Sequence, residues 1–169
     1  IETKLIYGEF GTMYHKSLVT GAIGEDYLGI FGKDKILWYN TTEGNFDTPI
    51  EIENTYYREY NGMTAVGDKC LMIANQGYFY INPKDNTLSE RVKIQGISFS
   101  GKCISNGEIL VICDLNAKNV QIVDVKNIKR PILLEEFAVD GNPDVACITE
   151  NSILIPCRYG GLLQLTIKE

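Results

Sequence analysis

Few residues of this sequence combine the types and the spacing that catalysis requires. The one histidine, His15, lies between Gly11 and Lys16, and a nucleophilic serine or cysteine needs such a base held against it in space. The neighbouring carboxylates Glu135 and Glu136 belong to an apolar run, in which one of two adjacent side chains faces water by default. We therefore predict no catalytic residues and expect the protein not to be an enzyme.

The five cysteines of the chain are an odd number, which excludes a fully paired disulfide framework, and no CxxC motif is present. Cys103 and Cys113 are ten residues apart, as are Cys147 and Cys157. We interpret them as small apolar core residues on neighbouring strands; a cross-strand disulfide or a metal pair is the alternative. Residues 114–119 lack the central glycine and distal glutamate of a calcium loop. We predict a turn there, and no metal or cofactor.

Aromatic side chains provide the strongest signal for binding, because tyrosine and arginine are the common anchors of protein interfaces. The chain has ten tyrosines and one tryptophan. Trp38 lies in the middle of an apolar run and is predicted to be core. The candidate partner-binding residues are Tyr14, Tyr56, Tyr57, Arg58, Tyr60, Arg158 and Tyr159. In the alternative interpretation, the tyrosines at 56, 57 and 60 extend an outer strand and pack internally.

Composition restricts the class of protein. The 169 residues are enough for about one domain with a core of its own. With 16 Lys and Arg against 22 Asp and Glu, the net charge is −6, which argues against non-specific binding of nucleic acid. No run approaches the 18 apolar residues of a membrane span. Unpaired cysteines favour the cytoplasm; a secreted or cell-surface location stays open, because a signal peptide removed before Ile1 would leave no trace.

The elements that must position these residues recur with a period of 42 residues. Four short apolar runs close at Asn40, Asn82, Asp124 and Thr166, at equal intervals of 42 residues. Similar runs precede each of them, and a further run follows the first three. Glycine, asparagine, aspartate and proline bound the runs, as is typical of strands and tight turns. No long stretch has a helical period, so essentially no helix is expected.

Four antiparallel strands in about 42 residues are typical of one blade of a β-propeller. We predict an all-β propeller domain over 1–169, with blades at about 17–52, 62–94, 101–139 and 144–169. The last blade lacks a fourth run, and residues 3–10 are the predicted outer strand that completes it, because pairing would remove exposed edges. The four blades form either a closed ring or the C-terminal part of a larger propeller.

Two of the repeats resemble known propeller families. Residues 31–40, which end in Tyr39 and Asn40, are similar to the third strand of WD40 repeats, with Tyr-Asn where Trp-Asp is usual. Residues 120–133 resemble a repeat of the LVIVD type. Both resemblances imply a propeller, and a WD40-like repeat implies an interaction scaffold.

We therefore expect a non-catalytic scaffold that binds a protein or peptide through loops on one rim, either alone or as a subunit of a larger assembly. On the predicted phase, this rim carries residues 140–144, Lys118, Arg158 and Tyr159. The alternative is a small-ligand or glycan-binding propeller, or a propeller hydrolase or lyase, that acts at the mouth of the central channel through Asp140, Asp144 and Arg158.

Overall fold

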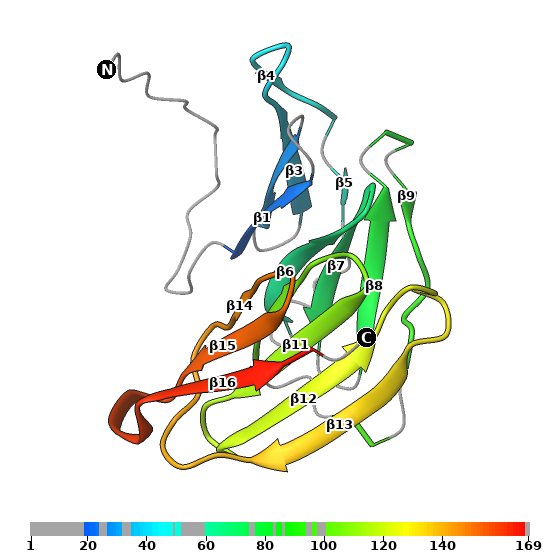
Figure 1. Cartoon of the computed structure of the whole chain (residues 1–169). Helices are drawn as coiled ribbons and strands as arrows, with labels where there is room; N and C mark the ends of the chain where they lie inside the picture. Colours follow the sequence, from blue (N-terminus) through cyan, green and yellow to red (C-terminus); the bar gives the residue numbers. More distant parts are fainter. Residues whose placement is uncertain are drawn as a thin grey trace, which may run out of the picture.

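The computed structural model describes residues 19–23, 27–31, 35–48, 50–51, 60–74, 77–82, 84–85, 87–93, 96–97 and 101–167. Its strands form four antiparallel sheets that follow one another along the chain (Figure 1). Sheet 1 consists of β1 (Val19–Ile23), β2 (Tyr27–Phe31), β3 (Lys35–Asn40), β4 (Asn45–Phe46) and β5 (Ile50–Glu51). Sheet 2 consists of β6 (Tyr60–Val66), β7 (Lys69–Ala74), β8 (Gly77–Asn82) and β9 (Thr87–Leu88).

The C-terminal half of the chain continues this pattern. Sheet 3 consists of β10 (Lys102–Ser105), β11 (Ile109–Asp114), β12 (Asn119–Asp124) and β13 (Ile132–Ala138). Sheet 4 consists of β14 (Cys147–Ile148), β15 (Ser152–Pro156) and β16 (Leu162–Thr166), with the 3₁₀ turn η2 (Arg158–Gly160) between the last two strands. That turn is the only helical segment among the described residues, which confirms the all-β prediction. No helix in this part of the chain is long and apolar enough to cross a membrane.

The predicted period is confirmed at the ends of the third strands. The strands β3, β8, β12 and β16 end at the four residues that the sequence places 42 apart. Asn40 Oδ1 accepts hydrogen bonds from the backbone N–H groups of Thr42 and Glu43, both at 3.0 Å. Such bonds make a short polar side chain a turn residue. At the end of β3, the recurring asparagine therefore turns the chain.

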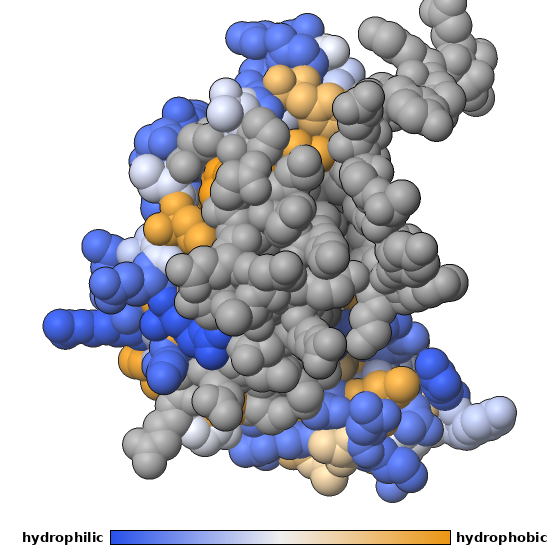
Figure 2. Space-filling model, turned by 180° about the vertical axis from the view of Figure 1, so that it is seen from behind, coloured by the Kyte–Doolittle hydropathy of each residue, from blue (hydrophilic) through white to orange (hydrophobic). Residues whose placement is uncertain are grey.

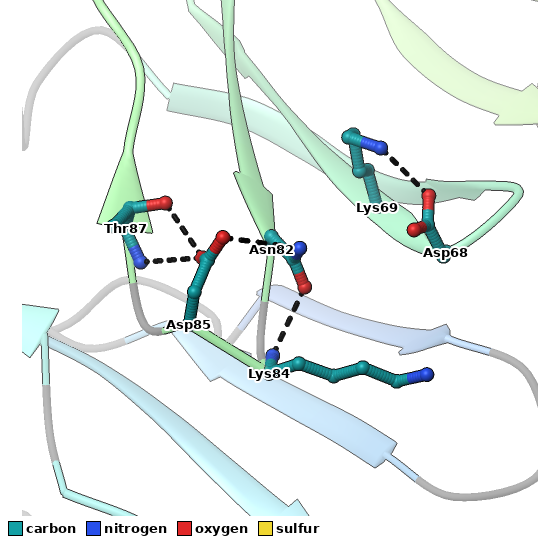
Figure 3. Close-up of polar contacts among 6 residues, drawn as sticks. All are labelled: Asp68, Lys69, Asn82, Lys84, Asp85 and Thr87. Carbon is teal, nitrogen blue, oxygen red and sulfur yellow. Dashed lines mark hydrogen bonds and ion pairs between the residues drawn. The ribbon is translucent and has the colours of Figure 1, made fainter.

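The turn after β8 is formed by side-chain hydrogen bonds of the same kind (Figure 3). Asn82 Oδ1 accepts the backbone N–H of Lys84 at 3.0 Å, and Asn82 Nδ2 donates to Asp85 at 3.2 Å. Asp85 in turn accepts both the backbone N–H and the hydroxyl of Thr87, where β9 begins. After β12, Asp124 accepts the N–H of Lys126 at 2.9 Å in the same manner.

The apolar core lies between the sheets. The first strands of successive sheets are in contact, β1 with β6, β6 with β10, and β10 with β14, so the sheets are arranged side by side. One buried cluster joins sheets 2 and 3 and contains Leu71, Ile73, Tyr78, Leu110, Ile112 and Val123. A second joins sheets 3 and 4 and contains Val111, Cys113, Val120, Ile153, Ile155 and Cys157. Sheet 3 is therefore apolar on both faces, as its continuous hydrophobic runs predict.

The outer strand of sheet 2 is divided into two parts. β9 lies next to the turn, and among residues 91–93 one isolated bridge forms, between Tyr78 and Val92. Between them, the backbone N–H of Ser89 donates to the carbonyl of Tyr80, and Ser89 Oγ accepts the backbone N–H of Tyr80, both at 3.0 Å. The hydroxyl thus replaces one of the two backbone acceptors of this pair. In sheet 1, both β4 and β5 pair with β3, and each has only two residues.

The predicted core residues differ in outcome. Trp38 is fully buried, as predicted. Cys113 and Cys157 are buried and Cys103 is half-buried, but Cys147 is exposed, so the core interpretation is wrong for that residue. It lies on β14 opposite Leu154, where no described element covers it. The predicted outer strand at 3–10 lies outside the described residues.

Candidate protein-interaction site

The structure describes three of the seven predicted partner-binding residues. Tyr60 is the first residue of β6, opposite Ala74, and is not part of the preceding connection. Arg158 and Tyr159 lie in η2 on the surface. The remaining four, Tyr14, Tyr56, Tyr57 and Arg58, lie outside the described residues.

The loop that connects sheets 3 and 4 packs against the connection between β15 and β16. The backbone N–H of Asn142 donates to the carbonyl of Cys157 at 3.1 Å, and that of Asp144 donates to Pro156 at 2.9 Å. Asn142 also donates from Nδ2 to the carbonyl of Leu115 at 2.9 Å. Residues 140–144, the β15–β16 turn and the β11–β12 turn therefore lie together on one rim, as the predicted phase requires.

The β15–β16 turn has an unusual backbone. Arg158 has φ 50°, a left-handed conformation that residues other than glycine seldom adopt. Gly161 follows with φ 81°. The N–H of Cys157 donates to the carbonyl of Gly161 at 2.7 Å, and the N–H of Gly161 donates to the carbonyl of Arg158 at 3.0 Å. The turn is held by its own backbone, and it presents the side chain of Tyr159 entirely to solvent, with 101% exposure.

A glycine attaches this turn to the neighbouring loop. A Cβ atom on Gly160 would lie 1.6 Å from the carbonyl oxygen of Asp140, which no side chain permits. The two backbones therefore approach more closely than any other residue would allow. This contact holds Tyr159 in a defined position relative to residues 140–144.

A groove of about 440 Å³ begins beside this turn and follows the outer edge of sheet 4. Figure 1 shows β16 in red and β13 in yellow, the two strands that border it. One wall comes from β13 and the residues after it, namely Glu135, Phe137, Ala138, Val139 and Asp140. The other wall comes from sheet 4, namely Cys157, Gly160, Leu162, Leu163 and Leu165. The groove is lined by both apolar side chains and the two acidic residues Glu135 and Asp140.

One ion pair lies near the rim. Lys102 Nζ lies 2.5 Å from Asp144 Oδ1, and this hydrogen bond lowers the pKa of Asp144 below its ordinary value. Asp144 therefore remains a carboxylate at neutral pH and is a poor general acid. Arg158 adds a positive charge at the end of the groove, and its field also lowers the pKa of Asp144.

The thiols of the core are unsuited to nucleophilic catalysis. Burial raises the pKa of Cys113 to about 12 and raises that of Cys70 further. A thiol that stays protonated at neutral pH is a weak nucleophile. Among the described residues, no group of three or more His, Cys, Asp or Glu side chains is placed to hold a metal ion.

The opposite face of the molecule differs from the groove. On the face seen in Figure 2, apolar residues of the described part form separate areas among hydrophilic ones. Isolated apolar residues of this kind are ordinary on protein surfaces. The described part of that face therefore offers no extended apolar area for docking.

Sequence reasoning identified the turn but not the groove. Arg158 and Tyr159 were predicted from residue type and repeat phase, whereas Phe137, Val139, Leu163 and Leu165 were assigned only to strands. The number of apolar runs could have pointed to the outer edge of the last sheet, because the fourth repeat has three apolar runs and the other repeats have four. Among the described residues, the third strand of sheet 4, β16, pairs with β15 alone, and the predicted partner of its outer edge, residues 3–10, lies outside the described part of the chain.

No protein-family model and no curated protein matches the sequence, but many solved structures share its fold. The WD40 domain of SCAP from fission yeast superposes with a TM-score of 0.63 at 12% identity, over 92% of this chain and 43% of that one. BamB from Moraxella catarrhalis gives a TM-score of 0.60 at 12% identity, over 86% of this chain and 42% of that one.

A third similar structure is an enzyme. Virginiamycin B lyase from Staphylococcus aureus gives a TM-score of 0.64 at 17% identity, over 88% of this chain and 51% of that one. The chain thus spans about half the length of these three proteins. The fold is that of the β-propellers, WD40 domains included, which confirms the predicted fold class and the WD40-like resemblance. Propellers host both binding and catalysis, so the fold does not choose between them.

Proposed function

We propose that the protein is a non-catalytic scaffold that binds a protein partner through the β15–β16 turn and the adjoining groove. The observation that carries this proposal is that a fully exposed tyrosine lies on a turn whose backbone is fixed by hydrogen bonds and a close contact. Tyr159 is 101% exposed, yet its turn is closed by backbone hydrogen bonds and held against Asp140 at Gly160. A turn whose backbone is already ordered loses little backbone entropy on binding.

The surroundings of Tyr159 support a protein partner. Arg158 is adjacent, and tyrosine and arginine are the residues that most often dominate the energy of protein interfaces. The groove beside them is lined by Phe137, Leu163 and other apolar residues, among them Leu162, which is 65% exposed. Exposed apolar side chains next to polar ones are the usual composition of such an interface.

The non-catalytic part of the proposal rests on the chemistry of the nearby groups. The carboxylate of Asp144 is engaged by Lys102, and the thiol of Cys113 is buried and protonated. Neither group has the pKa near neutrality that acid–base or nucleophilic catalysis favours.

For the location of the protein, we propose the cytoplasm, because its five cysteines are unpaired.

The test compares the wild-type chain with Tyr159→Ala and Arg158→Ala as bait for partners, followed by titration calorimetry with the purified partner. Each variant is expected to weaken binding by about 1–2 kcal/mol, or about 5- to 30-fold in Kd. Leu134→Ala is the matched control, because Leu134 is an exposed apolar residue on β13. Circular dichroism and the melting temperature report folding. Equal recovery of every partner with all variants would exclude this rim as the binding surface.

A further inference from the structure

The loop between β12 and β13 (Figure 1) gathers positive charge. Lys126, Lys129 and Arg130 lie within five positions, and residues 126–130, called the basic loop below, contain no acidic residue. All three cationic side chains belong to exposed residues. The rest of the chain has 13 Lys and Arg against 22 Asp and Glu. The basic loop therefore has the opposite sign of charge to the protein that carries it.

The corresponding turns of sheets 1 and 2 carry no such charge. The turn after β3 contains one charged residue, Glu43, and the turn after β8 contains Lys84 and Asp85, which have opposite charges. The bond from the backbone N–H of Lys126 to Asp124, at 2.9 Å, forms without the lysine side chain. The repeated turn therefore does not require cations, and their presence in sheet 3 needs another explanation.

Hydrogen bonds fix the backbone of the basic loop. The hydroxyl of Tyr78, which is fully buried in sheet 2, donates to the carbonyl of Ile128 at 2.5 Å. The backbone N–H of Lys129 donates to Asn127 Oδ1 at 3.1 Å, and that of Arg130 donates to the carbonyl of Asn127 at 2.9 Å. Folding has thus already brought the like charges together, and a ligand does not have to order this backbone when it binds.

The cations of the basic loop are available to a ligand. Lys126 pairs with Glu108 at 3.2 Å, and both side chains are more than half exposed. Exposed ion pairs are weak, so Lys126 can exchange Glu108 for a carboxylate of a ligand. Among the described residues, Lys129 and Arg130 make no ion pair. The planar guanidinium of Arg130 can hold a carboxylate through two parallel hydrogen bonds.

We propose that the basic loop binds an acidic segment of a partner protein, with several Asp or Glu side chains within a few residues. Lys129 and Arg130 hold the carboxylates, and Lys126 joins them by releasing Glu108. Nucleic acid and anionic membranes present charge over a wide area, and the acidic remainder of the chain would repel them. A short acidic segment avoids this repulsion.

This surface is additional to the one proposed around Tyr159. The basic loop follows the end of β12 at Asp124, whereas the β11–β12 turn, which shares the rim with Tyr159, precedes the other end of β12 at Asn119. Six residues of strand separate the two ends by about 20 Å. The two surfaces can therefore be tested one at a time.

The test measures the fluorescence anisotropy of a dye-labelled peptide, Ser-Asp-Glu-Asp-Glu-Ser, with the full chain. The double variant Lys129→Gln, Arg130→Gln should weaken binding by at least about tenfold, because two charge-assisted contacts are lost. The matched control is Lys102→Gln, Lys118→Gln, which removes the same charge at the opposite end of sheet 3. It should bind within about twofold of wild type.

A second variant tests the fixed backbone without changing any charge. Tyr78→Phe removes the hydrogen bond to Ile128 and should weaken binding of the peptide by about threefold or more. Ile73→Val, a conservative change in the same buried cluster, keeps this bond and should bind as wild type. The melting temperature of each variant reports folding. Unchanged binding by Tyr78→Phe would overturn the role of the fixed loop.

Three results would overturn the proposal. The first is equal binding of the peptide by wild type and the Lys129, Arg130 double variant, or no saturable binding at millimolar concentration. The second is tighter binding of an oligothymidine of equal charge, or of phosphatidylserine vesicles, which would assign the loop to another class of partner. The third is loss of peptide binding in Tyr159→Ala, which would place the peptide on the other surface.

Discussion

The strands β12 and β16 occupy the same place in the repeat, but their surroundings differ. Val120 on β12 is fully buried, whereas Leu162, 42 residues later, is 65% exposed. β12 has a paired strand on each edge, and its sheet has an apolar cluster on each face. Among the described residues, β16 has one paired strand, and its apolar cluster lies on one face. The comparison teaches that the position in the repeat determines where a strand forms. The strands and sheets packed against that strand determine whether its side chains are buried or exposed.

The largest expected effect comes from placing a charge at both positions. Val120→Asp buries a carboxylate between sheets 3 and 4 and should cost about 4 kcal/mol or more, because no described cation is available there to pair with it. Leu162→Asp should cost about 0.5 kcal/mol or less. Urea unfolding of both variants measures the difference. Similar losses would mean that the outer face of sheet 4 is covered in solution.

The next effect concerns the contact that holds sheet 4 to the loop before it. Gly160→Ala forces the β15–β16 turn away from Asp140, and we expect a loss of about 2 kcal/mol. Gly161→Ala is the matched variant, because Gly161 needs a left-handed backbone but has open space around it. It should lose about 1 kcal/mol. Thermal unfolding compares the two, and a smaller loss for Gly160→Ala would contradict the close approach.

Alkaline pH tests the cluster between sheets 3 and 4. Burial raises the pKa of Cys113 from 9.0 to about 12, so the folded state retains a proton that the unfolded state releases. The free energy of unfolding should therefore be unaffected below pH 9 and fall as the pH rises from about 9 towards 12. Cys113→Ala should reduce the slope of this fall. Val111 is buried on the same strand, and its side chain does not titrate. Val111→Ala should therefore lower stability without changing the slope.

The smallest effect belongs to the ion pair that links the two sheets. Lys102 lies on β10, and Asp144 precedes β14, with both side chains partly exposed. Asp144→Asn should cost less than about 1 kcal/mol. Because the pKa of Asp144 is lowered from 3.8, the contribution is complete above that pH and is lost as the pH falls through the folded pKa. A double-mutant cycle with Lys102→Ala at two salt concentrations measures it, and a cost independent of pH and salt would exclude an ionic origin.

The sequence predicted the elements whose signal is local. An asparagine or aspartate that bonds to the next turn needs only its own neighbours, so the ends of β3, β8 and β12 followed from Asn40, Asn82 and Asp124. The exposed position of Arg158 and Tyr159 followed from the repeat phase. The interrupted outer strand of sheet 2 did not, because the hydroxyl of Ser89 replaces a backbone acceptor and a serine carries no sign of that role in sequence.

The groove was beyond prediction for a different reason. Its walls come from β13 and β16, and each wall reads as an ordinary alternating strand. Phe137, Val139, Leu163 and Leu165 line one groove only because sheets 3 and 4 lie next to each other. The close approach at Gly160 was likewise hidden, since its partner is the backbone of Asp140, twenty residues away in the chain. Contacts of this kind depend on tertiary geometry rather than on residue type.

The location of the apolar clusters between neighbouring sheets also governs how the molecule comes apart. Each cluster belongs jointly to two sheets, so melting one sheet uncovers half of the next. In such an array of repeats, the stability of each sheet depends on the sheets next to it. Among the described sheets, sheet 1 and sheet 4 each contact a single neighbouring sheet, so fraying is easiest at these two. Thermal or mechanical stress should open them first and leave the segment around Tyr78 and Leu110 until last.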